Sequence, residues 1–151
     1  MTRPDLTRPD LTRALRLLAQ DADDLEVISA ALQDAVTRIG DIQWEPKRRR
    51  LTIAFNRFCW EAEAPTGLRV RAAVQLGGVM AVRGRNLRAD AKEAVLELLA
   101  LTFDPSEAPG GVITFAFADG GDLAATVECI DAALADLSAP WPAPHTPGHE
   151  G

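Results

Sequence analysis

The apolar residues of this chain come in short runs separated by turn-forming residues, and this pattern restricts the fold more than any other feature. Two of the breaks, Gly77-Gly78 and Asp119-Gly120-Gly121, suit tight hairpins because glycine supplies the positive φ that such turns need. Short apolar strands between turns are typical of an antiparallel β domain. We therefore expect seven strands, at residues 36–45, 50–61, 68–76, 79–85, 94–103, 111–118 and 122–127.

Three further segments lie near the ends of this series. Residues 22–34 carry apolar side chains at helical spacing, and Asp21 is placed to cap that helix. Residues 127–141 show the same spacing with acidic residues between the apolar ones, which predicts a C-terminal helix. Residues 15–19 form a short apolar run that we expect to be a strand.

Residues 91–101 fit two kinds of structure. Their composition is helical, and Asp90 could cap a helix there. Against this, Leu99, Leu101 and Phe103 alternate directly into the next turn, as they would in a strand. We favour the strand, and the helix remains the alternative.

The order of these elements predicts an α+β domain. Seven antiparallel strands followed by one amphipathic helix are the element order of a pleckstrin-homology-like barrel, in which the helix plugs an open end. Here a strand and a helix are added at the N-terminus. An antiparallel sheet covered by two or three helices is the alternative, and neither fold analogy carries a function with it.

One globular domain is expected over residues 14–141, between disordered tails at 1–13 and 142–151. The first tail is a tandem copy of Thr-Arg-Pro-Asp-Leu, and the second is rich in proline. No apolar run approaches the ~20 residues that span a bilayer and no secretory signal is visible, so we expect a cytoplasmic protein. Cys59 and Cys129 are then expected to be buried free thiols, and a disulfide between them is the alternative.

Charge is distributed unevenly along the chain, although the net charge is only −6. Residues 1–46 hold 5 basic and 9 acidic side chains, and residues 47–92 hold 11 basic and 3 acidic ones. Residues 93–151 hold 10 acidic side chains and no basic one. Such asymmetry is informative about partners rather than about the fold.

The strand at 50–61 changes phase within its length. Its bulky residues are odd-numbered up to Phe55 and even-numbered from Phe58, whereas a strand keeps one parity per face. A β-bulge at Asn56-Arg57 would let all of these bulky residues face inward and would turn Arg57 outward.

Outward-pointing arginines form the candidate binding site. If strands 50–61, 68–76 and 79–85 form a meander, the arginines that alternate with their apolar residues share one outer face. Like charges on neighbouring strands repel, so this face favours an anionic counterpart. The candidate binding residues are Arg57, Arg69, Arg71, Arg83 and Arg85. Two other interpretations remain: a solvated face, and a homodimer in which this face pairs with the acidic half of a second copy.

The sequence offers little for catalysis. His145 and His149 lie in the proline-rich tail, so neither a Ser-His-Asp arrangement nor a metal site is expected. No glycine-rich phosphate motif or CxxC cluster appears, so no cofactor is expected. Glu61, Glu63 and Asp90 could act as acids or bases, but the sequence does not indicate that any two of them lie together as a catalytic pair. Nucleic-acid binding is disfavoured because the chain is acidic and its aromatic residues fit the inward face.

Four separated segments carry a family resemblance. They are Asp-Ala-Asp-Asp-Leu-Glu-Val-Ile-Ser-Ala-Ala-Leu-Gln-Asp-Ala at 21–35, Asn-Arg-Phe-Cys-Trp-Glu at 56–61, Glu-Ala-Pro-Gly-Gly at 107–111 and Val-Glu-Cys-Ile at 127–130. Together they resemble a bacterial family, domain of unknown function 2948. Cys59 stands where the family motif has an aspartate, which implies that this position is not an essential carboxylate. The resemblance implies a small cytoplasmic protein without an assigned activity, and it supplies no catalytic residues.

The sequence therefore favours a non-catalytic interaction module that uses its arginine face for a protein or an anionic partner. The alternative is a small enzyme or small-ligand-binding protein with a pocket near the Asn56-Arg57 kink.

Overall fold

The computed structural model describes residues 15–58, 68–139 and 141–142. In this part of the chain there is one α-helix, α1 (Ala22–Ala31), and there are three 3-10 turns, η1 (Ile39–Asp41), η2 (Pro46–Arg48) and η3 (Ala118–Gly120). The strands are β1 (Arg16–Ala19), β2 (Val36–Arg38), β3 (Ile42–Glu45), β4 (Arg50–Phe58), β5 (Leu68–Leu76), β6 (Val79–Arg85), β7 (Val95–Pro105), β8 (Gly111–Phe117), β9 (Asp122–Val127), β10 (Ala132–Asp136) and β11 (Trp141–Pro142).

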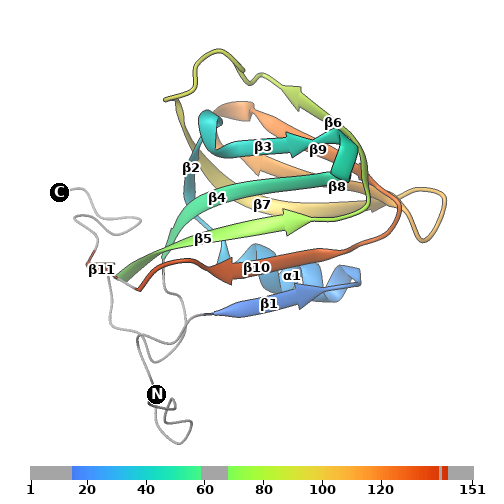
Figure 1. Ribbon diagram of the computed structural model, residues 1–151, viewed down its shortest axis with the longest axis horizontal. Helices are drawn as coiled ribbons and strands as arrows, with labels where there is room; N and C mark the ends of the chain where they lie inside the picture. Colours follow the sequence, from blue (N-terminus) through green and yellow to red (C-terminus); the bar gives the residue numbers. More distant parts are fainter. Residues whose placement is uncertain (1–14, 59–67, 140, 143–151) are drawn as a thin grey trace, which may run out of the picture.

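The strands form one open antiparallel sheet in the order β1-β10-β5-β4-β2-β7-β8-β9-β6, with β3 and β11 pairing onto β4 and β5. The sheet folds back on itself, so that β4, β5, β10 and β1 lie in front of β7, β8 and β9 (Figure 1). We call β1, β10, β5, β4, β3 and β2 the first layer, and β7, β8, β9 and β6 the second layer. The first layer ends at β1 and the second at β6.

Strand β7 connects the two layers because it changes partner along its length. Val95 to Glu97 pair with β2, and the strand pairs with β8 from Leu98 onward. The register with β8 shifts between Leu98 and Ala100, which marks an irregularity at the point of the change. Such irregularities bend a strand, and this one lies where the sheet turns from one layer into the other.

The core lies between the layers and is closed at one end by α1. Alternate residues of each strand point inward, as in Ile53 and Phe55 of β4 and Ile113 and Phe115 of β8, all of which are fully buried. The helix begins at its N-cap Asp21, whose carboxylate accepts a hydrogen bond from the backbone N–H of Asp24 at 2.8 Å. Its buried residues Leu25 and Ile28, together with the C-cap Leu32, join the same core cluster.

The predicted pleckstrin-homology-like barrel is wrong. The described strands form an open sheet rather than a closed seven-stranded barrel, and no helix follows them in the described residues of the C-terminal side. The alternative with two or three covering helices is wrong as well, because α1 is the one α-helix of the described residues. The strand interpretation of 91–101 is confirmed from Val95 onward, and the strands expected at 68–76, 79–85 and 122–127 are confirmed with their bounds.

The predicted C-terminal helix over 127–141 is replaced by strand β10. Buried Ile130 and Leu134 are four residues apart, a spacing that fits both a helix and one face of a strand. Ala132 between them is buried too, which only the strand explains. The backbone of β10 pairs with β1 on one side and β5 on the other, and Leu137, which the helical pattern placed inside, is 62% exposed.

The predicted β-bulge at Asn56-Arg57 is also wrong. Strand β4 pairs with β5 in unbroken register from Leu51 opposite Leu76 to Phe58 opposite Arg69. The odd-numbered parity therefore continues through Arg57, which points inward and is buried. The expected tails fall, except for Pro142, outside the described residues. Within the described residues, no helix is long and apolar enough to cross a membrane.

The turn at Gly77-Gly78 is a corner and not a hairpin. Gly78 has the positive φ of 64° that the glycines predicted, but β5 lies between β10 and β4 while β6 pairs with β9. The meander expected from β4, β5 and β6 therefore does not form. By contrast, the turn at Asp119-Gly120-Gly121 joins β8 to its neighbour β9 as predicted.

Candidate binding site on the second layer

Many of the basic and acidic side chains that are segregated along the sequence pair with one another in the fold. Arginines from the basic middle of the chain form ion pairs with carboxylates from both acidic ends. The pairs are Arg49–Glu128 at 2.7 Å, Arg57–Asp136 at 2.9 Å, Arg85–Asp122 at 2.6 Å, Arg71–Asp41 at 3.3 Å and Arg50–Glu45 at 3.2 Å. The asymmetry along the sequence is thus mainly an internal pairing of distant segments.

Arg57 belongs to a buried ion pair rather than to the surface. It donates two hydrogen bonds to Asp136, from Nε to Oδ1 and from Nη2 to Oδ2, both at 2.9 Å. The two side chains are 1% and 4% exposed. Asp136 Oδ2 also accepts the backbone N–H of Leu15 at 2.8 Å, and Arg57 Nη1 donates to the Phe58 carbonyl at 3.0 Å. The pair joins β4 to β10 and to the start of β1, which is a structural role.

Arg69 and Arg71 lie on the outer face of the first layer, and both are engaged there. The Arg69 guanidinium carbon lies 3.9 Å from the centroid of the Phe58 ring, a cation–π contact that covers this otherwise outward-facing phenylalanine. Arg71 donates from Nη1 to Asn56 Oδ1 at 3.1 Å and pairs with Asp41. These arginines therefore stabilise the sheet surface on which they lie.

A carboxyl pair that the sequence did not indicate lies beside Arg69. Desolvation raises the pKa of Glu97. The nearby carboxyl of Asp34 raises this pKa further, through its charge and a side-chain hydrogen bond, and so does the charge of Asp119. The Arg69 guanidinium opposes this increase. Desolvation lowers the pKa of Arg69, and Glu97 opposes that change in turn. Glu97 is an exposed residue, so water screens part of these interactions.

Replacement of Glu97 by glutamine is expected to change the pH dependence of stability. A carboxyl whose pKa is raised in the folded state favours folding below its ordinary pKa of about 4.5, and loses that contribution as the pH rises through the raised value. Glutamine stays neutral, so the variant should gain stability relative to the wild type as the pH rises from about 4.5 toward neutral. Thermal unfolding of both proteins across this range measures the difference, and parallel curves would contradict the prediction.

Arg83 differs from the other four candidate arginines. Its side chain is exposed on β6, and it forms no ion pair with any residue that the structure describes. It lines a hollow of about 330 Å³ on the outer face of the second layer. The other lining residues are Ala81, Val82, Val112, Ala124 and Thr126.

The hollow results from small side chains at neighbouring positions of three strands. Ala81 of β6 lies opposite Thr126 of β9, which lies opposite Val112 of β8. In the next row Arg83 lies opposite Ala124. Because alanine has only a methyl group, these positions leave a depression beside the long side chain of Arg83. The lining thus combines a mainly apolar floor with one cation and one hydroxyl.

A second, smaller hollow of about 130 Å³ adjoins the first and shares Val112 and Thr126 with it. Its lining includes the carboxylate residues Glu107 and Glu128. Glu128 is paired with Arg49, whereas Glu107 is exposed. The outer face of the second layer is therefore basic at Arg83 and acidic at its opposite end.

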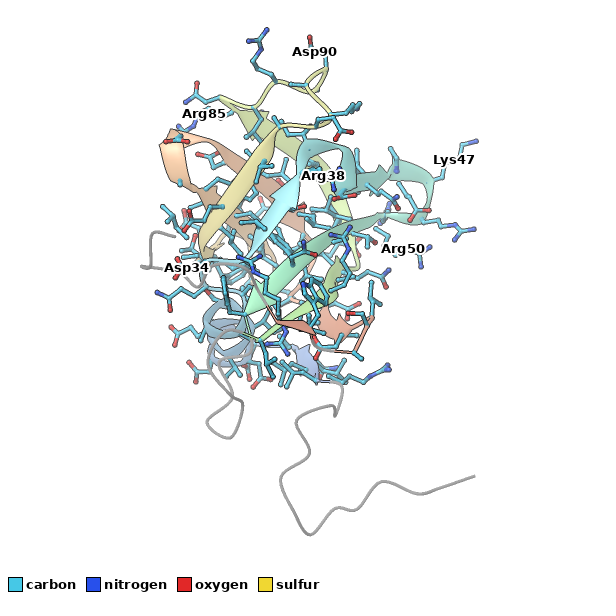
Figure 2. All side chains as sticks on the ribbon, turned by 90° about the vertical axis from the view of Figure 1, so that its left-hand side faces the viewer. Asp34, Arg38, Lys47, Arg50, Arg85 and Asp90 are labelled. Carbon is cyan, nitrogen blue, oxygen red and sulfur yellow. The ribbon has the colours of Figure 1, made fainter. Side chains whose placement is uncertain are left out.

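The structure does not bring the five predicted arginines onto one face. Arg57 is inside, Arg69 and Arg71 lie on β5 of the first layer, and Arg83 and Arg85 lie on β6 of the second. The side view separates Lys47 and Arg50 on the side of the first layer from Arg85 on the side of the second (Figure 2).

The remaining chemical candidates are not brought together. Asp90 is exposed in the segment between β6 and β7, and Glu61, Glu63, His145 and His149 lie outside the described residues. Among the described residues, no group of three or more His, Cys, Asp or Glu side chains is placed to hold a metal ion.

Of the cysteines, Cys129 is a free thiol as predicted, but it is exposed rather than buried. Cys59 lies outside the described residues. The expected pair of buried thiols is therefore wrong for Cys129.

Sequence reasoning found Arg83 but missed the hollow beside it. The available signal was the row of small residues on the outward face of the second layer, at Ala81, Ala124 and Thr126. That signal becomes readable only when the strand register is known, because the three residues come from two segments some forty positions apart.

These features define a β-rich domain built on one open antiparallel sheet, with a single helix in the described part and an arginine-lined hollow on its second layer. The family described as "Protein of unknown function (DUF2948)" matches residues 15–149, and the chain belongs to this family. Neither a curated protein nor a solved structure matches the chain.

Proposed function

We propose that this protein is a non-catalytic binding module that recognises an anionic group of its partner through Arg83. The observation that carries this proposal is the combination found at Arg83: an exposed guanidinium, no ion pair within the described residues, and a position in the wall of a hollow. The other four candidate arginines each have a structural engagement instead, in an ion pair or over an aromatic ring.

The chemistry of the hollow favours an anion attached to an apolar group. A guanidinium presents several N–H donors in a planar fork, which matches a carboxylate or a phosphate. The floor formed by Ala81, Ala124 and Val112 can contact an apolar group beside that anion. A volume of about 330 Å³ lies at the lower end of the range of small-molecule pockets. The hollow therefore suits one part of a larger partner better than a whole cofactor.

The proposed location is the cytoplasm. The exposed free thiol of Cys129 supports a reducing compartment, since exposed thiols persist there and are oxidised more readily outside it.

Charge reversal at Arg83 tests the proposal. In Arg83→Glu the guanidinium is replaced by a carboxylate, so retention of an anionic partner should fall about tenfold or more, which corresponds to roughly 1.4 kcal/mol. The change lies on the surface, so the melting temperature should be nearly unaltered. The measurement is affinity capture from native extract with the full chain as bait, at low and high salt.

Arg88→Glu provides the matched control. Arg88 is also exposed and forms no ion pair with a described residue, but it does not line the hollow. The partner should be retained by the control and lost by Arg83→Glu. Equal retention by both variants would show that Arg83 takes no part in binding.

A further inference from the structure

We propose that the partner binds as an acidic, extended protein segment that adds a strand to the free edge of β6. This inference rests on the recognition of an anion by Arg83 and specifies what carries that anion. The addition of a strand to an open sheet edge is a recurrent way of binding peptides, in which backbone hydrogen bonds supply affinity and side-chain pockets supply specificity.

Strand β6 has one edge to which no described strand pairs. It ends the order of the sheet and pairs with β9 alone. Near the start of the strand, the Val79 N–H donates to the Arg49 carbonyl at 2.9 Å, and the register with β9 shifts between Val79 and Ala81. The available edge therefore extends from Ala81 to Arg85.

The hollow is continuous with this edge. Ala81, Val82 and Arg83 of β6 line it together with residues of β9 and β8. Neighbouring strands in a sheet lie about 4.8 Å apart, so an added strand would place alternate side chains directly beside Ala81 and Arg83. One such side chain would enter the hollow, and a carboxylate two residues away along the added strand would reach the guanidinium.

The positive charge of the β6 edge determines which kind of strand can pair with it. Arg83 and Arg85 both project from β6, and only Arg85 is neutralised within the described residues, by Asp122 at 2.6 Å. A second copy of β6 would bring its own arginines to this edge, and like charges on paired strands repel. Charged residues on edge strands are a common protection against self-pairing. An acidic segment removes that repulsion and replaces it with attraction.

A peptide titration tests this mode of binding. The probe is a nine-residue, fluorescently labelled peptide that repeats glutamate, threonine and valine, so that a glutamate and a valine lie two residues apart on one face. A second peptide has the same side chains but N-methyl groups on alternate backbone nitrogens, so it cannot form the ladder. Fluorescence anisotropy is measured with the full chain as wild type, Arg83→Glu and Arg88→Glu, and amide exchange is followed in β6.

The expected result has three parts. The unmodified peptide binds the wild type and Arg88→Glu alike, and it binds Arg83→Glu about tenfold or more weakly. Its N-methylated form binds the wild type at least about tenfold more weakly than the unmodified one. Amides of residues 81–85 become protected from exchange when the unmodified peptide is present. Tenfold corresponds to roughly 1.4 kcal/mol.

Three other results would contradict strand addition. They also show whether recognition of an anion by Arg83 fails with it. If both peptides bind equally and both depend on Arg83, the anion is recognised without a backbone ladder. If neither peptide binds while Arg83-dependent capture of a native partner persists, the partner is not an acidic strand. If the wild type self-associates in sedimentation, Arg83→Glu abolishes that association and the peptide has no effect, the edge belongs to a second copy of the chain.

Discussion

Replacement of Asp136 by alanine is expected to lower the free energy of unfolding by about 3–5 kcal/mol. The substitution removes the bidentate acceptor of Arg57 and leaves a guanidinium charge in a site that is 1% exposed. The removal of one partner from a buried ion pair costs far more stability than the intact pair contributes. The backbone N–H of Leu15 loses its acceptor in the same change. Urea-induced unfolding of the wild type and the variant measures the effect.

The double variant Arg57→Met with Asp136→Leu is the control for this prediction. It removes both charges and keeps apolar volume, so much of the lost stability should return. A loss below about 1 kcal/mol in Asp136→Ala would contradict the buried ion pair, because exposed pairs have effects of that size.

Replacement of Phe115 by alanine is expected to have an effect of similar size, about 3–5 kcal/mol. Phe115 is fully buried on the inward face of β8, and it belongs to a core cluster that includes residues of both layers and of α1. Removal of the ring loses its transfer free energy and leaves a cavity that the two sheet layers can close only in part. Thermal and chemical unfolding both report this loss.

Leu99→Ala is the matched control, since Leu99 lies on β7 and is 52% exposed. Its expected effect is within about 0.5 kcal/mol. If Leu99→Ala destabilised the protein as much as Phe115→Ala, the assignment of inward and outward faces in the second layer would be wrong.

The strand elements could be predicted because local signals and tertiary pairing agree in them. In β5, β6 and β9 the apolar alternation and the flanking turns indicate the same bounds that the structure has. The C-terminal segment could not be predicted in the same way. The four-residue spacing of Ile130 and Leu134 fits the periodicity of a helix and that of a strand. The segment forms a strand because the backbones of β1 and β5 pair with β10 on both sides.

Arg57 shows a second limit of sequence reasoning. The change of parity between Phe55 and Phe58 led to the prediction of a bulge, which would have turned Arg57 outward. The chain instead keeps its register and places Arg57 inside, where Asp136 of β10, 79 positions away in sequence, accepts its hydrogen bonds. The outward Phe58 is covered by Arg69. Neither compensation is visible locally, since each depends on a partner from another strand.

The candidate site was predictable only in its charge. Arg83 and Arg85 could be placed on an outward face from the alternation of β6, but their separation from Arg69 and Arg71 follows from the long-range pairing of β6 with β9. The hollow likewise requires the registers of β6, β9 and β8 to be known.

Chemical-shift mapping of the full chain with its captured partner, or with the acidic peptide, shows which layer of the sheet carries the binding face. If binding occurs on the second layer, amide and methyl shifts should be perturbed at Ala81, Arg83, Val112, Ala124 and Thr126, and the outer face around Arg69 and Arg71 should be unaffected. Perturbations centred on Arg69 and Arg71, with β6 unchanged, would exclude binding at Arg83 and place the binding face on the first layer.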